Sequence, residues 1–205
     1  MRRPEFIARQ SARPSGLLGR VIAWIMARET AAENAAARRL LELAPADHVL
    51  ELGFGHGHNV VELARATPEG VVAGVDHSED MYALAEALCR PFIESGRVSL
   101  ACADTRELPY PEHAFHKALA VHTIYFWEDP LEHLREVQRV LRPGGRFVLG
   151  FRPKEDPASE NFPATVYRLH SPHDVEKMLA ASGFENVRVH APSEGFLAAC
   201  AERGK

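Results

Sequence analysis

Short apolar segments alternate with helical segments through the middle of the chain. Strands are predicted at residues 48–52, 71–75, 98–102, 118–121 and 146–151, with helices between most of them. This alternation predicts a mostly parallel sheet, because parallel strands need crossover connections that place helices on the faces of the sheet. A chain of 205 residues is long enough for one such domain with a core that needs no disulfide or metal.

The end of the chain departs from this pattern. Two further strands are predicted at residues 186–190 and 195–201, and only about four residues join them. So short a link permits an antiparallel hairpin and excludes a parallel crossover. We therefore expect an α/β fold that is Rossmann-like and doubly wound, with seven strands, one antiparallel strand near the C-terminus and helices on both faces.

Residues 1–44 are expected to form an N-terminal arm with helices near 16–29 and 30–43, ahead of a main domain at 45–205. The first 28 residues carry six arginines and one acidic residue, Glu5. They form either a solvated arm and helix face, or a contact with an acidic substrate or lipid surface. The apolar stretch at 16–26 is interrupted by Arg20 and is too short to span a membrane.

Composition limits the class of protein. The net charge of −4 argues against a nucleic-acid binder. Cys89, Cys102 and Cys200 lie far apart, which fits a reducing compartment, and we expect a cytoplasmic protein. Because the eleven histidines and three cysteines show no metal-ligand spacing, no metal site is expected.

Glycines and carboxylates follow the predicted strands, where an open α/β sheet binds its ligands. Gly53, Gly55 and Gly57 form a strand-to-helix turn. Asp76 stands about 20 residues beyond this turn, at the end of the second strand, where a carboxylate can accept hydrogen bonds from both hydroxyls of a ribose. A dinucleotide fingerprint requires a third glycine where His58 stands. Glu51, two residues before the first glycine, would repel a diphosphate and attract an ammonium or sulfonium group. The pattern favours a cationic nucleoside.

Four segments resemble motifs of one family. Glu51-Leu52-Gly53-Phe54-Gly55-His56-Gly57 is similar to the first motif of class I S-adenosylmethionine-dependent methyltransferases, and Gly74-Val75-Asp76-His77-Ser78-Glu79-Asp80-Met81 to the second. Ala103-Asp104-Thr105 and Arg139-Val140-Leu141-Arg142-Pro143-Gly144-Gly145 resemble the later two. The likeness covers about residues 45–155 and is nearest to the small-molecule branch that resembles ubiquinone/menaquinone-biosynthesis methyltransferases. His116 stands where that family commonly has aspartate, a position expected to be structural.

The resemblance implies a cofactor site for S-adenosylmethionine, which leaves as S-adenosylhomocysteine. The backbone of the glycine loop would approach the methionine moiety, Glu51 its ammonium, and Asp76 the ribose. Asp104 and Thr105 would bind adenine, with His77 and Met81 over its face, although Met81 is equally explained as core. The implied cofactor-binding set is Glu51, Gly53, Phe54, Gly55, Gly57, Asp76, His77, Met81, Asp104, Thr105 and His122.

The acceptor side of the site is less defined. His122 ends the fourth strand, where it would serve as a general base or as a polar residue that touches the cofactor by its backbone. Tyr125, Phe126 and Trp127 either line an acceptor pocket or pack a loop onto the next helix. The resemblance also implies that the helices within residues 1–44 cap the site and exclude water. Trp24 is then expected to face the acceptor or to be buried against the sheet.

These expectations predict a methyltransferase that acts on a small-molecule acceptor by in-line displacement, as a monomer or homodimer. The alternative is a non-catalytic S-adenosylmethionine-binding sensor or partner subunit. A nicotinamide-dependent oxidoreductase is disfavoured by His58. A nucleic-acid or protein substrate is disfavoured by the acidic charge balance.

Overall fold

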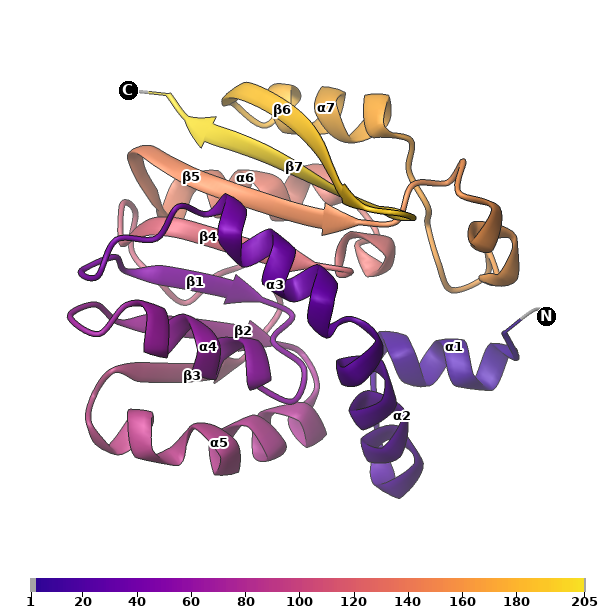
Figure 1. The fold of residues 1–205 in the computed structure, drawn as a ribbon, viewed down its shortest axis with the longest axis horizontal. Coiled ribbons are helices and arrows are strands. Elements are labelled where there is room, and N and C mark those ends of the chain that lie inside the picture. The colour runs from indigo at the N-terminus through magenta and orange to yellow at the C-terminus, as the bar shows by residue number, and fades with distance from the viewer. Residues whose placement is uncertain (1–2, 205) are drawn as a thin grey trace.

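The computed structural model describes residues 3–204, except for the side chains of Leu17, Leu18 and Arg20. Within these residues seven strands form one sheet in the order β3-β2-β1-β4-β5-β7-β6 (Figure 1). Their bounds are β1 Val49–Leu52, β2 Val72–Asp76, β3 Val98–Cys102, β4 Phe115–Val121, β5 Leu141–Phe151, β6 Phe184–Ser193 and β7 Phe196–Arg203. The first five strands pair in parallel, whereas β7 is antiparallel to both β5 and β6. The expected sheet, with its one reversed strand, is confirmed.

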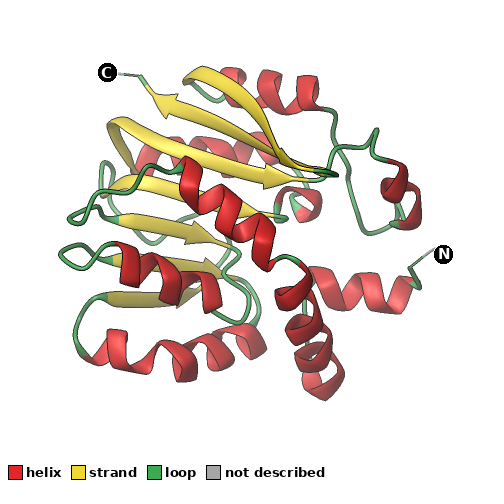
Figure 2. Ribbon diagram, viewed as in Figure 1, coloured by secondary structure: helices red, strands yellow, loops and turns green. Residues whose placement is uncertain are grey.

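Helices cover both faces of the sheet (Figure 2). The bounds are α1 Glu5–Ala12, α2 Gly16–Glu29, α3 Ala31–Leu40, α4 His58–Ala66, α5 Glu79–Glu94, α6 Pro130–Val140 and α7 Pro172–Ala181, with short 3-10 helices η1 Ile124–Phe126 and η2 Pro157–Asn161. In the view of Figure 1, α3, α4 and α5 lie in front of the sheet, and α6 and α7 lie behind it. The pair α1 and α2 lies beyond the ends of the strands, on the side toward which β1, β4 and β5 point (Figure 1).

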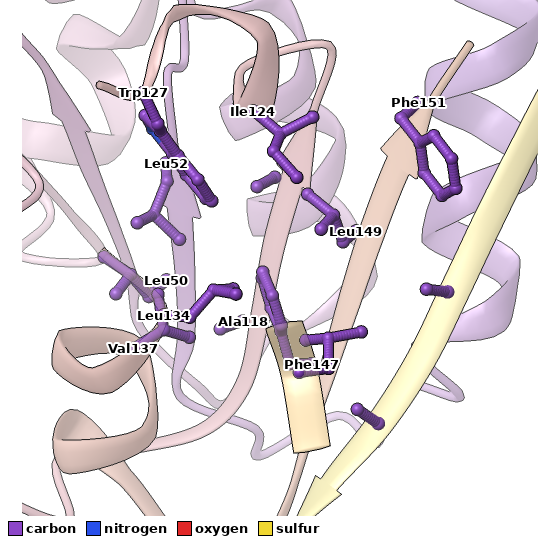
Figure 3. Close-up of a cluster of buried hydrophobic side chains, with 14 of the residues drawn as sticks. Leu50, Leu52, Ala118, Ile124, Trp127, Leu134, Val137, Phe147, Leu149 and Phe151 are labelled. Atoms are coloured by element: carbon purple, nitrogen blue, oxygen red, sulfur yellow. The ribbon is translucent and has the colours of Figure 1, made fainter. Parts of the chain in front are cut away.

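Two apolar layers hold the helices to the sheet. Behind it, Leu134 and Val137 of α6 pack near Leu50 of β1 and Phe147 of β5, all of them fully buried (Figure 3). In front, α3, α4 and α5 contribute the second layer with residues such as Ala37, Val60 and Cys89. Because β1 and β2 are buried on both faces, their sequences are apolar without alternation, except for the site carboxylates Glu51 and Asp76.

Side-chain caps start helices α5, α6 and α7. The Ser78 hydroxyl accepts from the Met81 amide at the start of α5, and Asp129 accepts from the Leu131 amide at the start of α6. Ser171 forms a capping box with Asp174 at the start of α7. These local signals are readable from the sequence, because a capping side chain needs only the amides two or three residues ahead.

Helix α1 is an element that the sequence analysis did not predict. It begins after Pro4 and contains an exposed Glu5–Arg9 ion pair of 2.7 Å one turn apart. A helix of eight residues is not stable on its own, so its packing against α2 stabilises it. Strand β5 also begins earlier than expected, at Leu141, and includes the Pro143-Gly144-Gly145 segment.

We expect Leu50→Ala to lower the free energy of unfolding by about 2–5 kcal/mol, because it leaves a cavity in the layer between α6 and the sheet. Urea unfolding followed by circular dichroism measures the change. Leu88→Ala is the matched control, since Leu88 on α5 is 39% exposed. Equal losses in the two variants would contradict this account of the core.

Candidate active site

A cavity of about 980 Å³ lies at the carboxyl ends of the parallel strands. One wall comes from α1, α2 and α3, and includes Trp24, Met26 and Asn34. The opposite wall comes from the loop after β1 and from the residues that end β2, β3 and β4. Strands that run in the same direction bring these chain-distant loops to one edge of the sheet, where ligands of such folds bind.

The loop after β1 lines the cavity with glycine backbone, which has no side chains. Gly53 has a φ of 71°, and a Cβ there would collide with the Thr123 side chain, so only glycine fits. Gly55 has a φ of 55°, and no atom lies within 4 Å of where its Cβ would stand. Both residues line the cavity, whereas Gly57 lies behind it against Ala85 of α5.

Glu51 is a buried carboxylate at the floor of the cavity. Its Oε1 accepts a hydrogen bond of 2.7 Å from Asn59 Nδ2, and the Asn59 carbonyl accepts from Arg38 of α3. Burial raises the pKa of Glu51 to about 8, and the Asn59 hydrogen bond and the charge of Arg38 oppose that rise. Without a cationic partner, Glu51 is therefore largely protonated at neutral pH.

Three buried polar atoms around this loop have no hydrogen-bond partner among the described residues. They are Glu51 Oε2, His56 Nε2 and Thr123 Oγ1, and all three residues line the cavity. Because His56 Nδ1 accepts from the His58 amide, Nε2 is the nitrogen left to donate. Burial lowers the pKa of His56 to about 4. Buried polar groups without partners are uncommon, and their grouping here indicates a polar ligand.

Asp76 ends β2 with its carboxylate held by backbone. Oδ2 accepts from the Gly55 amide and Oδ1 from the Ser78 amide, each at 2.9 Å. The group is buried, and burial raises its pKa, while the two amides lower it. Since each carboxylate oxygen has a second lone pair, Asp76 can still accept hydrogen bonds from the cavity that it lines.

The residues expected around adenine lie along the same cavity. His77 is exposed at its rim, and Met81 is buried in its wall. Asp104 is already bound by the Arg106 guanidinium at 2.7 Å, which holds the pKa of that carboxyl below its usual value. Thr105 Oγ1 lies 2.6 Å from His133 Nδ1, and the His133 ring stacks on Trp127 with centroids 4.7 Å apart.

His122 occupies the end of β4 in a left-handed backbone conformation, with a φ of 58°. Its Nε2 lies 2.5 Å from Glu33 Oε2 of α3, and its Nδ1 lies 3.0 Å from the Tyr125 hydroxyl. The Tyr125 oxygen also accepts from the Arg152 amide, so its own hydrogen is free to point at His122 Nδ1. This network indicates that the proton of His122 sits on Nε2 and is donated to Glu33.

The aromatic residues divide between cavity and core. Phe126 and Trp127 line the cavity, whereas Tyr125 is buried behind them and is absent from the lining among the described residues. Burial raises the pKa of Tyr125. Trp24 lines the cavity mouth with 55% of its surface exposed, and the Arg28 guanidinium lies 4.4 Å from its ring centre.

Sequence reasoning missed four residues that the structure brings to the site: Arg38, Asn59, Glu33 and His133. Arg38 and Glu33 come from α3, outside the segment that carries the recognisable motifs. Asn59 stands two residues after the last loop glycine, and this spacing is a local signal that could have identified it. The other three are placed by packing of distant segments.

Comparison with known proteins identifies the class. Residues 50–149 match the family described as "Methyltransferase domain". The uncharacterized methyltransferase YdaC of Bacillus subtilis is 26% identical over 172 residues, which are 82% of this chain and 88% of YdaC. The ubiquinone/menaquinone biosynthesis C-methyltransferase UbiE of Geobacter sulfurreducens is 35% identical over 102 residues, 49% of this chain and 40% of that protein.

The solved structure of the S-adenosylmethionine-dependent methyltransferase SibL superposes with a TM-score of 0.74 at 22% identity. The match covers 97% of this chain and 62% of SibL. The chain thus spans nearly all of YdaC but only about 40% of UbiE and of several other curated relatives. The family match thus places a methyltransferase domain at residues 50–149, and the fold of the chain is the one found in S-adenosylmethionine-dependent methyltransferases such as SibL.

Across residues 3–204, none of the helices is both long enough and apolar enough to cross a bilayer.

The raised pKa of Glu51 predicts a pH-dependent stability. The folded pKa is about 8 and the ordinary value is 4.5, so the folded chain binds more protons between these pH values. The free energy of unfolding therefore falls as pH rises through this window, by about 1 kcal/mol per pH unit. In Glu51→Gln this contribution is absent, and the variant should gain stability relative to wild type between pH 5 and pH 9.

Urea unfolding at pH 5, 7 and 9 measures this difference. Glu94→Gln, which changes an exposed carboxylate at the end of α5, should follow wild type at every pH. Parallel stability curves for wild type and Glu51→Gln would show that Glu51 is ionised in the folded protein at all three pH values.

Proposed function

We propose that this chain transfers the methyl group of S-adenosylmethionine to a small-molecule acceptor bound in the cavity between the N-terminal helices and the sheet edge. The observation that carries the proposal is the group of unpartnered polar atoms, Glu51 Oε2, His56 Nε2 and Thr123 Oγ1, around a glycine loop at the cavity floor. They offer an acceptor and two donors, which suit the ammonium and carboxylate of an amino acid moiety.

Glu51 is the residue suited to the ammonium group. Its Oε1 is held by Asn59, and its Oε2 is free to accept. A bound cation favours the ionised carboxylate, so the pKa of Glu51 falls on binding and a proton is released near neutral pH. The Arg38–Asn59–Glu51 chain orients the Asn59 amide with its nitrogen toward Glu51.

Asp76 is the residue suited to the ribose. The Gly55 and Ser78 amides fix its carboxylate, so no side-chain entropy is lost when its remaining lone pairs accept hydroxyls. Asp104, Thr105, His77 and Met81, the residues expected around adenine, line the same cavity.

When bound, S-adenosylmethionine supplies a methyl group on a sulfonium for in-line attack by the acceptor. The protein contributes alignment and the exclusion of water. Helices α2 and α3 wall the cavity with Trp24, Met26 and Asn34, which supports the capping role expected of residues 1–44. Phe126 and Trp127 supply an apolar surface for the acceptor.

With both ring nitrogens engaged, His122 is better suited to positioning α3 than to removing a proton from the acceptor. Glu33 holds its Nε2 and Tyr125 its Nδ1, so neither ring nitrogen is free for a substrate proton. We therefore propose that His122 anchors α3 to the end of β4. A base role requires that the Tyr125 hydroxyl leave Nδ1 first.

Relatives support a small acceptor. UbiE is named for C-methylation in ubiquinone and menaquinone biosynthesis, and another relative is named a 27-O-demethylrifamycin SV methyltransferase. Since the chain spans only 40% of each, their substrates are not transferred to it.

Asp76→Asn should weaken binding of S-adenosylhomocysteine about tenfold or more, because the amide replaces a charged acceptor by a weaker one that also presents donors. Isothermal titration calorimetry measures the dissociation constant, with NADH as the control ligand. Glu79→Gln, an exposed substitution three residues later in the first turn of α5, should bind as wild type does. Unchanged affinity in Asp76→Asn, or tight binding of NADH, would overturn the cofactor assignment at this residue.

Turnover separates the enzyme from the non-catalytic sensor. We expect S-adenosylhomocysteine to accumulate when wild type is incubated with methyl-labelled S-adenosylmethionine and a panel of phenols, enols, amines and thiols, with label recovered in one acceptor class. Gly55→Val, which fills the space at the cavity floor and strains a left-handed backbone, should abolish that transfer. Firm cofactor binding with no labelled product from any acceptor would favour the sensor.

A further inference from the structure

A second cleft of about 470 Å³ adjoins the main cavity. Ala12, Arg13 and Phe126 line both spaces, so the cleft continues from the acceptor side of the cavity. Its walls are the C-terminal end of α1 with the residues after it, and the segment that follows η2. We call it the arginine cleft, and its lining residues are Arg9, Gln10, Ala12, Arg13, Ser15, Phe126, Thr165, Val166 and Arg168.

The arginine cleft is positively charged. Three of its lining residues are arginines, and none of its described lining residues is acidic. Arg9 is paired with Glu5 at 2.7 Å, so its charge is largely compensated. Arg13 and Arg168 are exposed and form no ion pair or side-chain hydrogen bond with any described residue. The chain as a whole has a net charge of −4, so this positive charge is local.

The remaining groups of the cleft suit an anion carried on an apolar body. Ser15 and Thr165 provide hydroxyl donors beside the arginines, whose planar guanidinium groups match the geometry of carboxylates and phosphates. Phe126 and Val166 provide the apolar part of the lining. The Gln10 side chain accepts from the Ser15 amide at 2.9 Å and so holds the turn between α1 and α2.

The cleft is tied to the backbone of the active site. The Arg168 amide donates to the Tyr125 carbonyl at 3.0 Å, which fixes one wall against η1. Tyr125 in turn contacts His122 through its hydroxyl, and Phe126 is the next residue. A group held in the cleft is therefore positioned by the same short segment that lines the acceptor side of the cavity.

We propose that the arginine cleft binds an anionic group of the methyl acceptor, a phosphate or a carboxylate, through Arg13 and Arg168, while the part to be methylated lies in the main cavity. This rests on the proposed function, and it selects anionic acceptors among small molecules. It also gives the arginine-rich N-terminal segment a role in substrate recognition, with Arg13 as a charged residue that lines both spaces.

The test compares probes that differ only in charge. Phenyl phosphate and phenol, or benzoate and benzyl alcohol, are titrated into the ¹⁵N-labelled full chain and followed by NMR, with and without S-adenosylhomocysteine. We expect wild type to bind each anionic probe about tenfold or more tightly than its neutral partner. In Arg13→Gln/Arg168→Gln this preference should disappear. Arg90→Gln, an exposed arginine on α5 outside both spaces, should retain it.

The outcomes separate this inference from the proposed function. Equal binding of charged and neutral probes by wild type, or an unchanged preference in the double variant, would overturn the cleft assignment. Calorimetry with S-adenosylhomocysteine should give wild-type affinity in the single variant Arg168→Gln, since Arg168 lines the arginine cleft and not the main cavity. Failure of wild type to bind S-adenosylhomocysteine would instead count against the proposed function. The NMR comparison without cofactor would still show whether the arginine cleft binds anionic probes.

Vesicles identify the source of the anionic group. Phosphatidylcholine vesicles with and without phosphatidylglycerol are sedimented with wild type and the double variant. Binding to anionic vesicles that depends on both arginines would assign the anion to a lipid headgroup. Preference for phenyl phosphate or benzoate without vesicle binding would assign it to a free small acceptor.

Discussion

The parallel pairing of β1 with β2 and β4 is the constraint on which the site depends. Val49 to Leu52 pair with β2 on one side and β4 on the other, so three strands end at one level. Glu51 within β1, Asp76 at the end of β2 and His122 just after β4 consequently face one cavity, although they are distant in sequence. Had any of these strands run the other way, its functional residue would lie at the opposite edge of the sheet.

The same edge carries groups that do not favour folding. Glu51 is buried with one oxygen unpartnered, and His122 holds a left-handed backbone conformation that only glycine adopts freely. Neither feature improves packing, and both are compensated by the two apolar layers that cover the sheet. Local costs of this kind concentrate where a protein binds or transforms a ligand.

Helix α3 packs into the front apolar layer, and at the cavity it reaches the site residues through polar contacts. Glu33 of α3 contacts both His122 and, at 3.7 Å, the guanidinium of Arg152, and Arg38 reaches Asn59 beside the glycine loop. Charged groups held in partly buried positions specify geometry more strictly than apolar contacts do. A wall attached in this way can hold the shape of the cavity while its outer face, with Trp24, stays open to solvent.

The sequence by itself determined the alternation of strands and helices, the reversed strand at the end, the caps at Ser78 and Asp129, and the glycine loop with Glu51 and Asp76. These features depend on periodicity, on near-neighbour hydrogen bonds or on a motif with fixed spacing, all of which are local. Helix α1, the early start of β5, the Glu33–His122–Tyr125 network and the arginine cleft were decided by tertiary structure. Each brings together residues whose separation in sequence has no fixed relation to their distance in space, and α1 is too short to form without the helix against which it packs.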